Sequence, residues 1–497
     1  MDQLKVGALL SYIALAINII VGLLYTPWMI NSIGKEDYGL YTLALSVISI
    51  FVFDFGISHA VTRFVAKHLA EGSQEKANNC LGLVYKLYIY IDIIIFFVLV
   101  SIYFFIPQIY RELTPNEIEK FKIIYVIVSL FSVISFPFIP VNGILTAAEK
   151  FIQLKFCDLI HKLFIVATMS VCLLMGFGLY ALVLINVIAG LLTILLKLLF
   201  IKKDTNISVN FLYENKIELR EILQFSGWVT IKSLAARMIF TLSPSIIAMV
   251  SGSVEVALFG VVNVIEGYVY SFSSAISGLF LPRVYRLNSH EEGDVMPLMI
   301  KVGRILLIII AFIIVVFVSI GHQFLTLWLG EGFEKIYWSV VLVILPSIIY
   351  IPHEIGFCAI DVQNKVKYQA IVFVAMSVVN IIIGYFLASK YGCLGICISI
   401  FIAYSIRNIG IDYIMKKNLQ LDISRFFMEV FGNSLGYILV TLLICIAIGL
   451  LPIKGWGGLC VKVLGCALVY LSLVYSFVLN SDEHMIVKSI FKLRCKK

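Results

Sequence analysis

Long apolar runs recur from one end of this chain to the other, and each of them contains few charged residues. A helix needs about 20 mostly apolar residues to cross about 30 Å of hydrocarbon, and these runs are long enough. They are too long for the strands of a membrane barrel, which have about 10 residues of strictly alternating character. The chain is also 61% hydrophobic and 14% charged, whereas soluble domains are roughly 45 to 50% apolar and about 25% charged. The sequence therefore predicts an all-α polytopic membrane protein.

The apolar runs predict about fourteen transmembrane helices. They lie near residues 7–32, 39–62, 81–106, 121–147, 151–175, 179–201, 224–249, 254–280, 298–323, 337–362, 366–388, 393–415, 427–450 and 457–479. The first run is long and lacks a small-residue cleavage site, so we expect a retained helix rather than a signal peptide. The ten cysteines are scattered, and a disulfide framework is not expected.

The basic residues predict the orientation of these helices. With the N-terminus inside, 28 of the 38 Lys and Arg residues fall on the cytoplasmic side, 7 fall outside, and 3 lie within spans. Cytoplasmic loops carry the excess of basic residues in membrane proteins. Both termini are therefore expected in the cytoplasm, the last of them as a basic tail over residues 481–497. The same bias accounts for the net charge of +8 without a nucleic-acid partner.

Two halves of the chain repeat the same landmarks in the same order. The matching landmarks are Pro27 and Pro244, Gly34 and Gly252, Arg63 and Arg283, Pro140 with Gly143 and Pro352 with Gly356, and Gly178 and Gly392. Both repeats start at the same membrane face only if each contains six helices, an arrangement known from transporters with two parallel lobes. We expect an N-terminal lobe at residues 1–205, a C-terminal lobe at 206–418, and two extra helices at 419–480.

Two short segments resemble a known family. Residues 34–41 (GKEDYGLY) and 53–57 (FDFGI), followed by Arg63, resemble the polysaccharide transporter family that includes O-antigen flippases. This family belongs to the multidrug, oligosaccharidyl-lipid and polysaccharide exporter superfamily, and residues 143–150 and 176–181 fit the same pattern less specifically. The resemblance implies two six-helix lobes around a central cavity, with two further helices.

The resemblance also implies a function and a location. A member would move undecaprenyl-diphosphate-linked oligosaccharide, such as an O-antigen, lipopolysaccharide or capsule repeat unit, to the outer leaflet of the bacterial cytoplasmic (inner) membrane. Alternating access, partners in glycan assembly, and coupling to protons or sodium ions would follow. The second half departs from the family pattern, because Phe272 stands at the position that corresponds most closely to Asp54.

Lys232 and Arg237 lie inside the seventh predicted span. A charge there costs at least about 2.5 to 3.5 kcal/mol and normally faces a wet cavity or a partner. The diphosphate of a lipid-linked sugar would suit both cations, because Arg offers two parallel hydrogen bonds and Lys a point charge. The alternative is an intramembrane ion pair with Glu266 or Asp54.

The eighth span carries a polar stripe that we expect to line the cavity. Its members, spaced by three or four residues, are Asn263, Glu266, Tyr270, Ser273 and Ser277. Asp54 and Glu266 are the candidates for ion coupling, with structural pairing as the alternative. The candidates for binding the diphosphate or sugar are Lys232, Arg237, Asn263, Tyr270 and Arg63, although Arg63 would also suit a topology anchor.

Other polar residues carry weaker signals. Asp92 and Asp361 are secondary carboxylate candidates, and Arg407 is compatible with either anchoring or headgroup contact. His161 and His353 lack the spacing of metal ligands and receive no catalytic role.

An enzyme is the less favoured class. The sequence contains no Ser, His and Asp constellation, metal motif or phosphate-binding Gly-rich loop, and it predicts no cofactor. A membrane-bound glycan polymerase or ligase would need a large external loop, whereas the longest predicted one is residues 107–120. A cation-coupled multidrug exporter of the same superfamily is the nearer alternative, but it would favour acidic rather than basic cavity residues.

Overall fold

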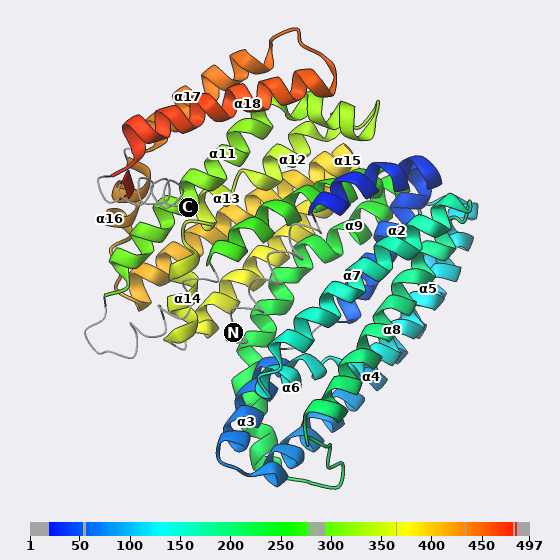
Figure 1. Ribbon diagram of the computed structural model, residues 1–497. Coiled ribbons are helices and arrows are strands. Elements are labelled where there is room, and N and C mark those ends of the chain that lie inside the picture. Colours follow the sequence, from blue (N-terminus) through cyan, green and yellow to red (C-terminus); the bar gives the residue numbers. More distant parts are fainter. Residues whose placement is uncertain are drawn as a thin grey trace, which may run out of the picture. The chain divides into compact units, whose positions relative to one another are not determined.

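The protein folds into helices, as the apolar runs predict (Figure 1). The computed structural model describes residues 19–52, 56–277, 284, 294–363, 365–432, 434–480, 483 and 484. Within these ranges there are no strands. The chain divides into two compact units: unit 1 comprises residues 1–264 and 366–403, and unit 2 comprises residues 265–365 and 404–497.

The all-α membrane fold is confirmed, and the number of fourteen helices stays a prediction. In the described part of the chain, nine helices are long and apolar enough to span a membrane, or ten if one bent pair counts as a span. Two of these helices each cover two predicted spans. They are α9 (Lys216–Ser277) and α15 (Val366–Asn418), which turn at Gly252 and Gly392 respectively.

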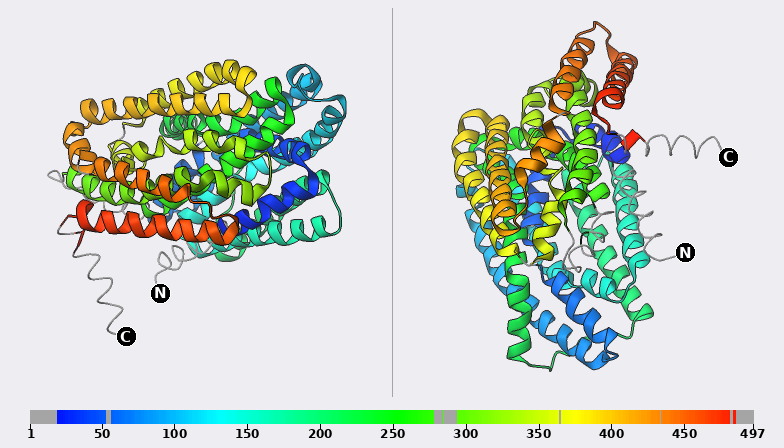
Figure 2. Two further views of the ribbon diagram at one scale, coloured as in Figure 1. Left: turned by 90° about the horizontal axis from the view of Figure 1, so that it is seen from above. Right: turned by 90° about the vertical axis from the view of Figure 1, so that its left-hand side faces the viewer.

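Unit 1 is a bundle of membrane-length helices. It contains the helix Ile19–Ile33, then α2 (Lys35–Phe51), α3 (Ile57–Ala70), α4 (Gln74–Ile109), α5 (Pro115–Ser135), η1 (Phe136–Phe138), α6 (Val141–Ala147), α7 (Phe151–Leu174), α8 (Leu179–Asp204), and the first parts of α9 and α15. Consecutive helices α7 and α8 lie side by side, as do α4 and α5 (Figures 1 and 2). Only residues 110–114 separate α4 from α5, so the predicted external loop at 107–120 is shorter than expected.

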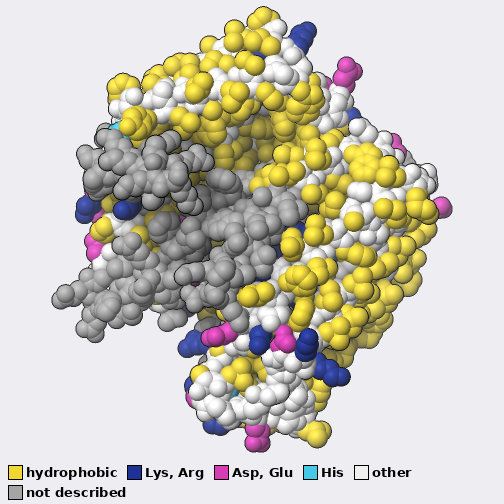
Figure 3. All heavy atoms as spheres, viewed as in Figure 1, with side chains coloured by type: hydrophobic (Ala, Val, Ile, Leu, Met, Phe, Trp, Pro, Cys, Tyr) yellow, Lys and Arg dark blue, Asp and Glu magenta, His cyan; other side chains and the backbone are white. Residues whose placement is uncertain are grey.

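The surface of unit 1 has the distribution of a membrane protein. Large apolar side chains on its lateral helices are exposed, among them Leu130, Leu174 and Leu195 at 61%, 78% and 53%. Figure 3 shows hydrophobic side chains over α5, α7 and α8, while charged side chains gather at the end that contains α3 and α6. An exposed apolar band of this extent is stable in lipid rather than in water.

Unit 2 is built around α11 (Met296–Leu329). Its other elements are the last part of α9, η2 (Glu334–Ile336), α12 (Tyr337–Ile344), α13 (Ser347–Tyr350), α14 (Glu354–Val362), the last part of α15, α16 (Ile423–Phe427), the π-helical turns η3 (Met428–Gly432) and η4 (Val474–Val478), α17 (Ser434–Gly449) and α18 (Gly455–Leu473). The hairpin of α17 and α18 packs along α11 (Figure 1).

Buried polar contacts fasten this hairpin to α11 at both ends. At one end Arg304 donates to both carboxylate oxygens of Glu483, at 2.8 and 3.0 Å, and to the carbonyl of Val478 at 2.7 Å. At the other end the Lys462 ammonium donates to Gln323 and to the carbonyl of Gly449, both at 2.8 Å. Lys462, a cation within the last predicted span, therefore has hydrogen-bond acceptors on both α11 and α17.

Several of the repeated landmarks have the same local structure. Gly34 and Gly252 both adopt an extended backbone with positive φ, at 85° and 80°, which favours glycine. Pro140 precedes the short helix α6, and Pro352 lies at the 59° bend before α14. Proline removes a helical hydrogen bond, which explains why both predicted spans are broken there.

Candidate functional site

Unit 2 holds a buried cation between two aromatic rings. The guanidinium carbon of Arg407 on α15 lies 4.2 Å from the ring centre of Tyr350 on α13 and 4.1 Å from that of Tyr404. The two rings meet edge to face at 5.6 Å. Arg407 is 8% exposed, so this contact is removed from bulk solvent. A desolvated cation over an aromatic ring is stabilised by about 2 kcal/mol or more.

A buried carboxylate lies close to the same cation. Glu266 on α9 is 8% exposed, and its carboxylate interacts electrostatically with Arg407. Tyr270, one helical turn further along α9, is 51% exposed and interacts electrostatically with Glu354, Glu266 and Arg407. We call Glu266, Tyr350, Tyr404 and Arg407 the Arg407 cluster.

The composition of the Arg407 cluster limits its chemistry. It contains one acid and one base, and both come from helices that the sequence predicts to span the membrane. Intramembrane charges of this kind are typical of substrate or ion pathways. The guanidinium offers a planar set of donors to an anion, and the carboxylate can take up a proton or a cation. Nothing in this arrangement resembles a nucleophile with its base.

A second buried polar pair lies near the start of α14. His353 is 2% exposed, its Nδ1 lies 2.6 Å from the carbonyl oxygen of Ile349, and its Nε2 lies 3.1 Å from Oδ1 of Asp412 on α15. Sequence reasoning gave His353 no role, because Asp412 is 59 positions away and no spacing rule joins them. The bend that brings the two together is signalled only by Pro352.

The predicted cations of α9 lie in unit 1. Lys232 is half-buried and Arg237 is exposed. Residues five apart on a helix point about 140° apart, which explains their unequal burial. Arg63 on α3 is exposed, and Asn263 is half-buried.

The other predicted site residues divide between the units or fall outside the description. Glu266 and Tyr270 belong to unit 2, and Asp54 lies outside the described residues. The side chains of Ser273 and Ser277 are likewise not described. Each of these assignments to substrate or ion binding stays a prediction.

His161 and the secondary carboxylate candidates Asp92 and Asp361 lie in different surroundings. His161 on α7 contacts Thr193 of α8 at 2.9 Å, which joins two neighbouring helices. Asp92 on α4 is half-buried, and its Oδ1 has no hydrogen-bond partner among the described residues. Asp361 on α14 is exposed.

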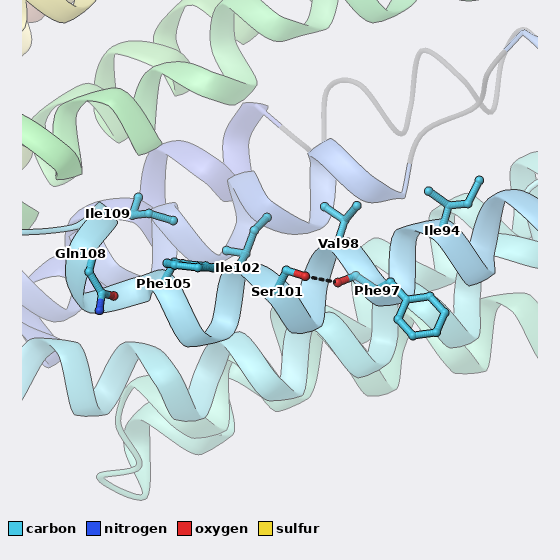
Figure 4. A pocket seen from close by; sticks show the side chains of 8 residues that line it. All are labelled: Ile94, Phe97, Val98, Ser101, Ile102, Phe105, Gln108 and Ile109. Carbon is cyan, nitrogen blue, oxygen red and sulfur yellow. Dashed lines mark hydrogen bonds between the residues drawn. The ribbon is translucent and has the colours of Figure 1, made fainter.

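An apolar groove follows α4 on unit 1. It has a volume of about 560 Å³, and Figure 4 shows side chains such as Ile94, Val98 and Phe105 along it. Its only polar lining side chains are Ser101, which donates to the carbonyl of Phe97 at 2.8 Å, and Gln108. Without a charged group the groove suits a hydrocarbon chain rather than a phosphate.

Comparison with known sequences places the chain among glycan-related membrane proteins. The model of the family described as "Polysaccharide biosynthesis protein" matches residues 5–286, more than half of the chain. A Shigella flexneri protein named "Putative O-antigen transporter" is 22% identical over 401 residues, which cover 77% of this chain and 91% of that protein. The resemblance inferred from residues 34–41 and 53–57 is thereby confirmed.

Solved structures show the same fold. An inward closed conformation of the lipid II flippase MurJ matches with a TM-score of 0.71 and 15% identity, covering 94% of this chain and 98% of that chain. An inward-facing multidrug resistance MATE family transporter of the MOP superfamily matches with a TM-score of 0.63 and 15% identity, covering 81% of this chain and 96% of its own. These relatives are described as transporters or a flippase rather than enzymes, in agreement with the class expected from the sequence.

Proposed function

Because this chain belongs to the polysaccharide biosynthesis protein family, we propose that it is a flippase for undecaprenyl-diphosphate-linked oligosaccharide. It would carry an O-antigen or capsule repeat unit from the cytoplasmic to the outer leaflet of the bacterial cytoplasmic membrane. Both termini would lie in the cytoplasm, and alternating access of two lobes would be driven by an ion gradient. The substrate class is taken from the names of the similar transporter and flippase.

The observation that carries this proposal is the presence of cations in membrane-spanning helices. Lys232 and Arg237 interrupt an apolar helix of unit 1, and Arg407 is buried in unit 2. A lipid-linked sugar presents a diphosphate that must leave water while it crosses the membrane. Cations held within the bilayer offset that loss of hydration through charge-assisted hydrogen bonds.

The apolar tail of such a substrate needs a different surface. The groove along α4 faces outward and lacks charged lining residues. We propose that hydrocarbon chains occupy this face, while the diphosphate is bound by cations such as Lys232 and Arg237. This division agrees with the general rule that charged groups in membrane helices avoid lipid and apolar ones face it.

An export assay tests the proposal. Replacing both Lys232 and Arg237 by Gln should abolish the appearance of glycan at the cell surface while the amount of protein in the membrane is unchanged. The matched control is Lys416→Gln, which removes an exposed cation one residue beyond the predicted span 393–415. Normal export by the Lys232→Gln, Arg237→Gln double variant would exclude diphosphate binding by these residues.

The alternative, a cation-coupled multidrug exporter, gives the opposite phenotype. Deletion of the gene would then sensitise the cells to cationic drugs and leave surface glycan intact. The buried Glu266 is the feature that favours this alternative, because acidic groups bind cationic drugs. The positive charge of Arg407 acts on the same carboxylate, which favours an anionic substrate instead.

A further inference from the structure

The His353 and Asp412 pair of unit 2 is not used by the proposed substrate path, yet its surroundings are those of a functional site. His353 stands at the break between α13 and α14, where the chain bends by 59°. Its ring lies 4.5 Å from the ring of Phe426 and 5.3 Å from that of Phe427 on α16. The imidazole is thus held among aromatic rings at the junction of three elements.

Both ring nitrogens of His353 face hydrogen-bond acceptors. Nδ1 points to a backbone carbonyl oxygen at 2.6 Å, and Nε2 lies 3.1 Å from a carboxylate oxygen of Asp412. A neutral imidazole carries one N–H, so it can donate to only one of two acceptors. The other nitrogen would then direct its lone pair at an oxygen. A ring with one more proton, an imidazolium, carries an N–H on both nitrogens and could donate to both acceptors.

The contact between Nε2 and Asp412 is close but not fully aligned. The two atoms are at ion-pair distance, but their geometry does not meet the criteria of a hydrogen bond. Asp412 is 24% exposed and His353 is 2% exposed, so the carboxylate is the more accessible member of the pair. A proton that enters or leaves the pair would therefore pass through Asp412.

We propose that His353 and Asp412 form a proton-binding site that couples proton movement to the Arg407 cluster. One proton added to the neutral imidazole and the carboxylate gives an imidazolium–carboxylate pair, and its loss restores both groups. This inference rests on the proposed transport function and names the coupling ion as the proton. It assigns coupling to residues other than Asp54 and Glu266.

The route from this pair to the Arg407 cluster is short. Tyr350 precedes His353 by three residues, about one helical turn, on the same broken span. Arg407 precedes Asp412 by five residues on α15, about 7.5 Å along the axis. Loss of the proton would weaken the contact that holds the α13–α14 break against α15. The two elements that carry Tyr350 and Arg407 would then be free to shift relative to each other.

Other charged groups around the pair are already engaged or exposed. The elements packed near His353 carry Lys301 and Arg304 on α11, Glu354 on α14, Lys416 on α15, and Asp422 and Arg425 on α16. Arg304 bonds Glu483, and Arg425 donates to Glu429 at 2.6 Å. Lys301 and Lys416 are exposed. Asp412 is the ion-pair contact of the ring.

The packing behind the ring limits how it can respond. A Cβ at Gly303 of α11 would lie 3.0 Å from the carbonyl oxygen of Pro352 and 3.0 Å from the ring of Phe426. The helix therefore presses on the break from the other side. Close packing against α11 makes movement toward α15 the expected response to a change in charge at His353.

Nuclear magnetic resonance of the full-length protein tests the site without any substrate. The chain has seven histidines, so labelling with ¹³Cε1-histidine gives few signals, and His353→Gln identifies the one of interest. We expect the His353 signal of the wild type to change with pH, and Asp412→Asn to alter that change, because it removes the negative charge 3.1 Å from Nε2. His322→Gln, at an exposed position on α11, is the matched control.

Two results would overturn the inference. One is a neutral His353 ring from pH 5 to 8 in the wild type, and the other is an unchanged signal in Asp412→Asn. Either result would leave the proposed flippase function standing, because neither measures transport. The assignment of the His353 signal requires that His353→Gln folds correctly, which is shown if the signals of the other histidines are unchanged.

A transport measurement separates the two proposals further. Proteoliposomes with undecaprenyl-diphosphate-linked repeat units, in sodium-free buffer, should flip faster when a pH gradient is imposed. His353→Gln and Asp412→Asn should lose this acceleration and keep the rate seen without a gradient. If the wild type flips at the same rate with and without a pH gradient, proton coupling is rejected and the flippase function stands. If neither the wild type nor any variant flips the substrate, the flippase function is rejected.

Discussion

Gly39 of α2 packs directly on the backbone carbonyl of Ser253 in α9, within unit 1. A Cβ built at Gly39 would overlap that oxygen, so no larger residue fits without a shift of the backbone. Ser253 also donates its hydroxyl to Glu117, which closes the capping box at the start of α5. The presence of glycine at position 39, within residues 34–41, thus has a steric reason, because α2, α5 and α9 meet at this point.

Replacing Gly39 by Ala should destabilise unit 1. Forcing a methyl group into a packed contact costs typically about 1 to 3 kcal/mol. We expect a lower melting temperature of the detergent-solubilised protein and less protein in the membrane. Gly227→Ala is the matched control, because a Cβ at Gly227 meets nothing within 4 Å. Equal melting temperatures for the two variants would contradict the close approach of α2 and α9.

Several features of the fold were predictable because they depend on local sequence. Apolar runs gave the helical membrane fold, and Pro140 and Pro352 mark the breaks in two spans. The chain also turns at Gly252 and at Gly392, between predicted spans, because both glycines have non-helical backbone angles with positive φ. A glycine between two apolar runs is the local signal for such a turn.

The candidate site was less predictable because it depends on contacts between distant segments. Glu266 was selected for its place in a polar stripe, but its partner Arg407 was read as an anchor or headgroup contact. The aromatic surroundings of Arg407 come from Tyr350 and Tyr404 on different elements. A pair such as His353 and Asp412 leaves no periodic signal at all. Only the packing of α13, α14 and α15 brings these side chains together.

Changing Arg407 to Lys should reveal how much the aromatic rings contribute. Lysine keeps the charge but loses the planar guanidinium that stacks on Tyr350 and Tyr404. We expect Arg407→Lys to retain part of the glycan export and Arg407→Gln to lose it, with both present in the membrane. Arg425→Lys, at an exposed position on α16, should export normally. Full export by Arg407→Gln would show that the cation is not needed.

The ion pair of Arg304 and Glu483 should make stability depend on acid pH. Burial raises the pKa of Glu483, but the hydrogen bonds from Arg304 and from the Asn480 backbone outweigh it, so the pKa lies below its usual value of 4.5. A lowered pKa means that the ionised carboxylate stabilises the folded protein above pH 4.5. That contribution is lost as the pH falls through the folded-state pKa.

Thermal melting at several pH values measures this effect. The wild type should lose stability below about pH 4.5, while Glu483→Gln should already be less stable at pH 7 and change less on acidification. Removing one partner of a buried pair costs about 3 to 5 kcal/mol. Glu71→Gln, which removes an exposed partner of Lys67, is the control. A wild type and Glu483→Gln with the same melting curves at pH 7 would contradict the pairing.

The charges of Glu266 and Arg407 allow structural and functional roles to be separated. Arg407→Gln strands a buried carboxylate, and Glu266→Gln strands a buried guanidinium, so each single variant should melt at a lower temperature than the wild type. The double variant removes both charges and leaves neither stranded. We therefore expect its melting temperature to return toward that of the wild type. If Arg407 binds the diphosphate, the double variant should still fail to export glycan, because the missing cation and not the stranded acid is then the fault. Restored stability together with restored export would assign the pair a purely structural role and move substrate binding to Lys232 and Arg237.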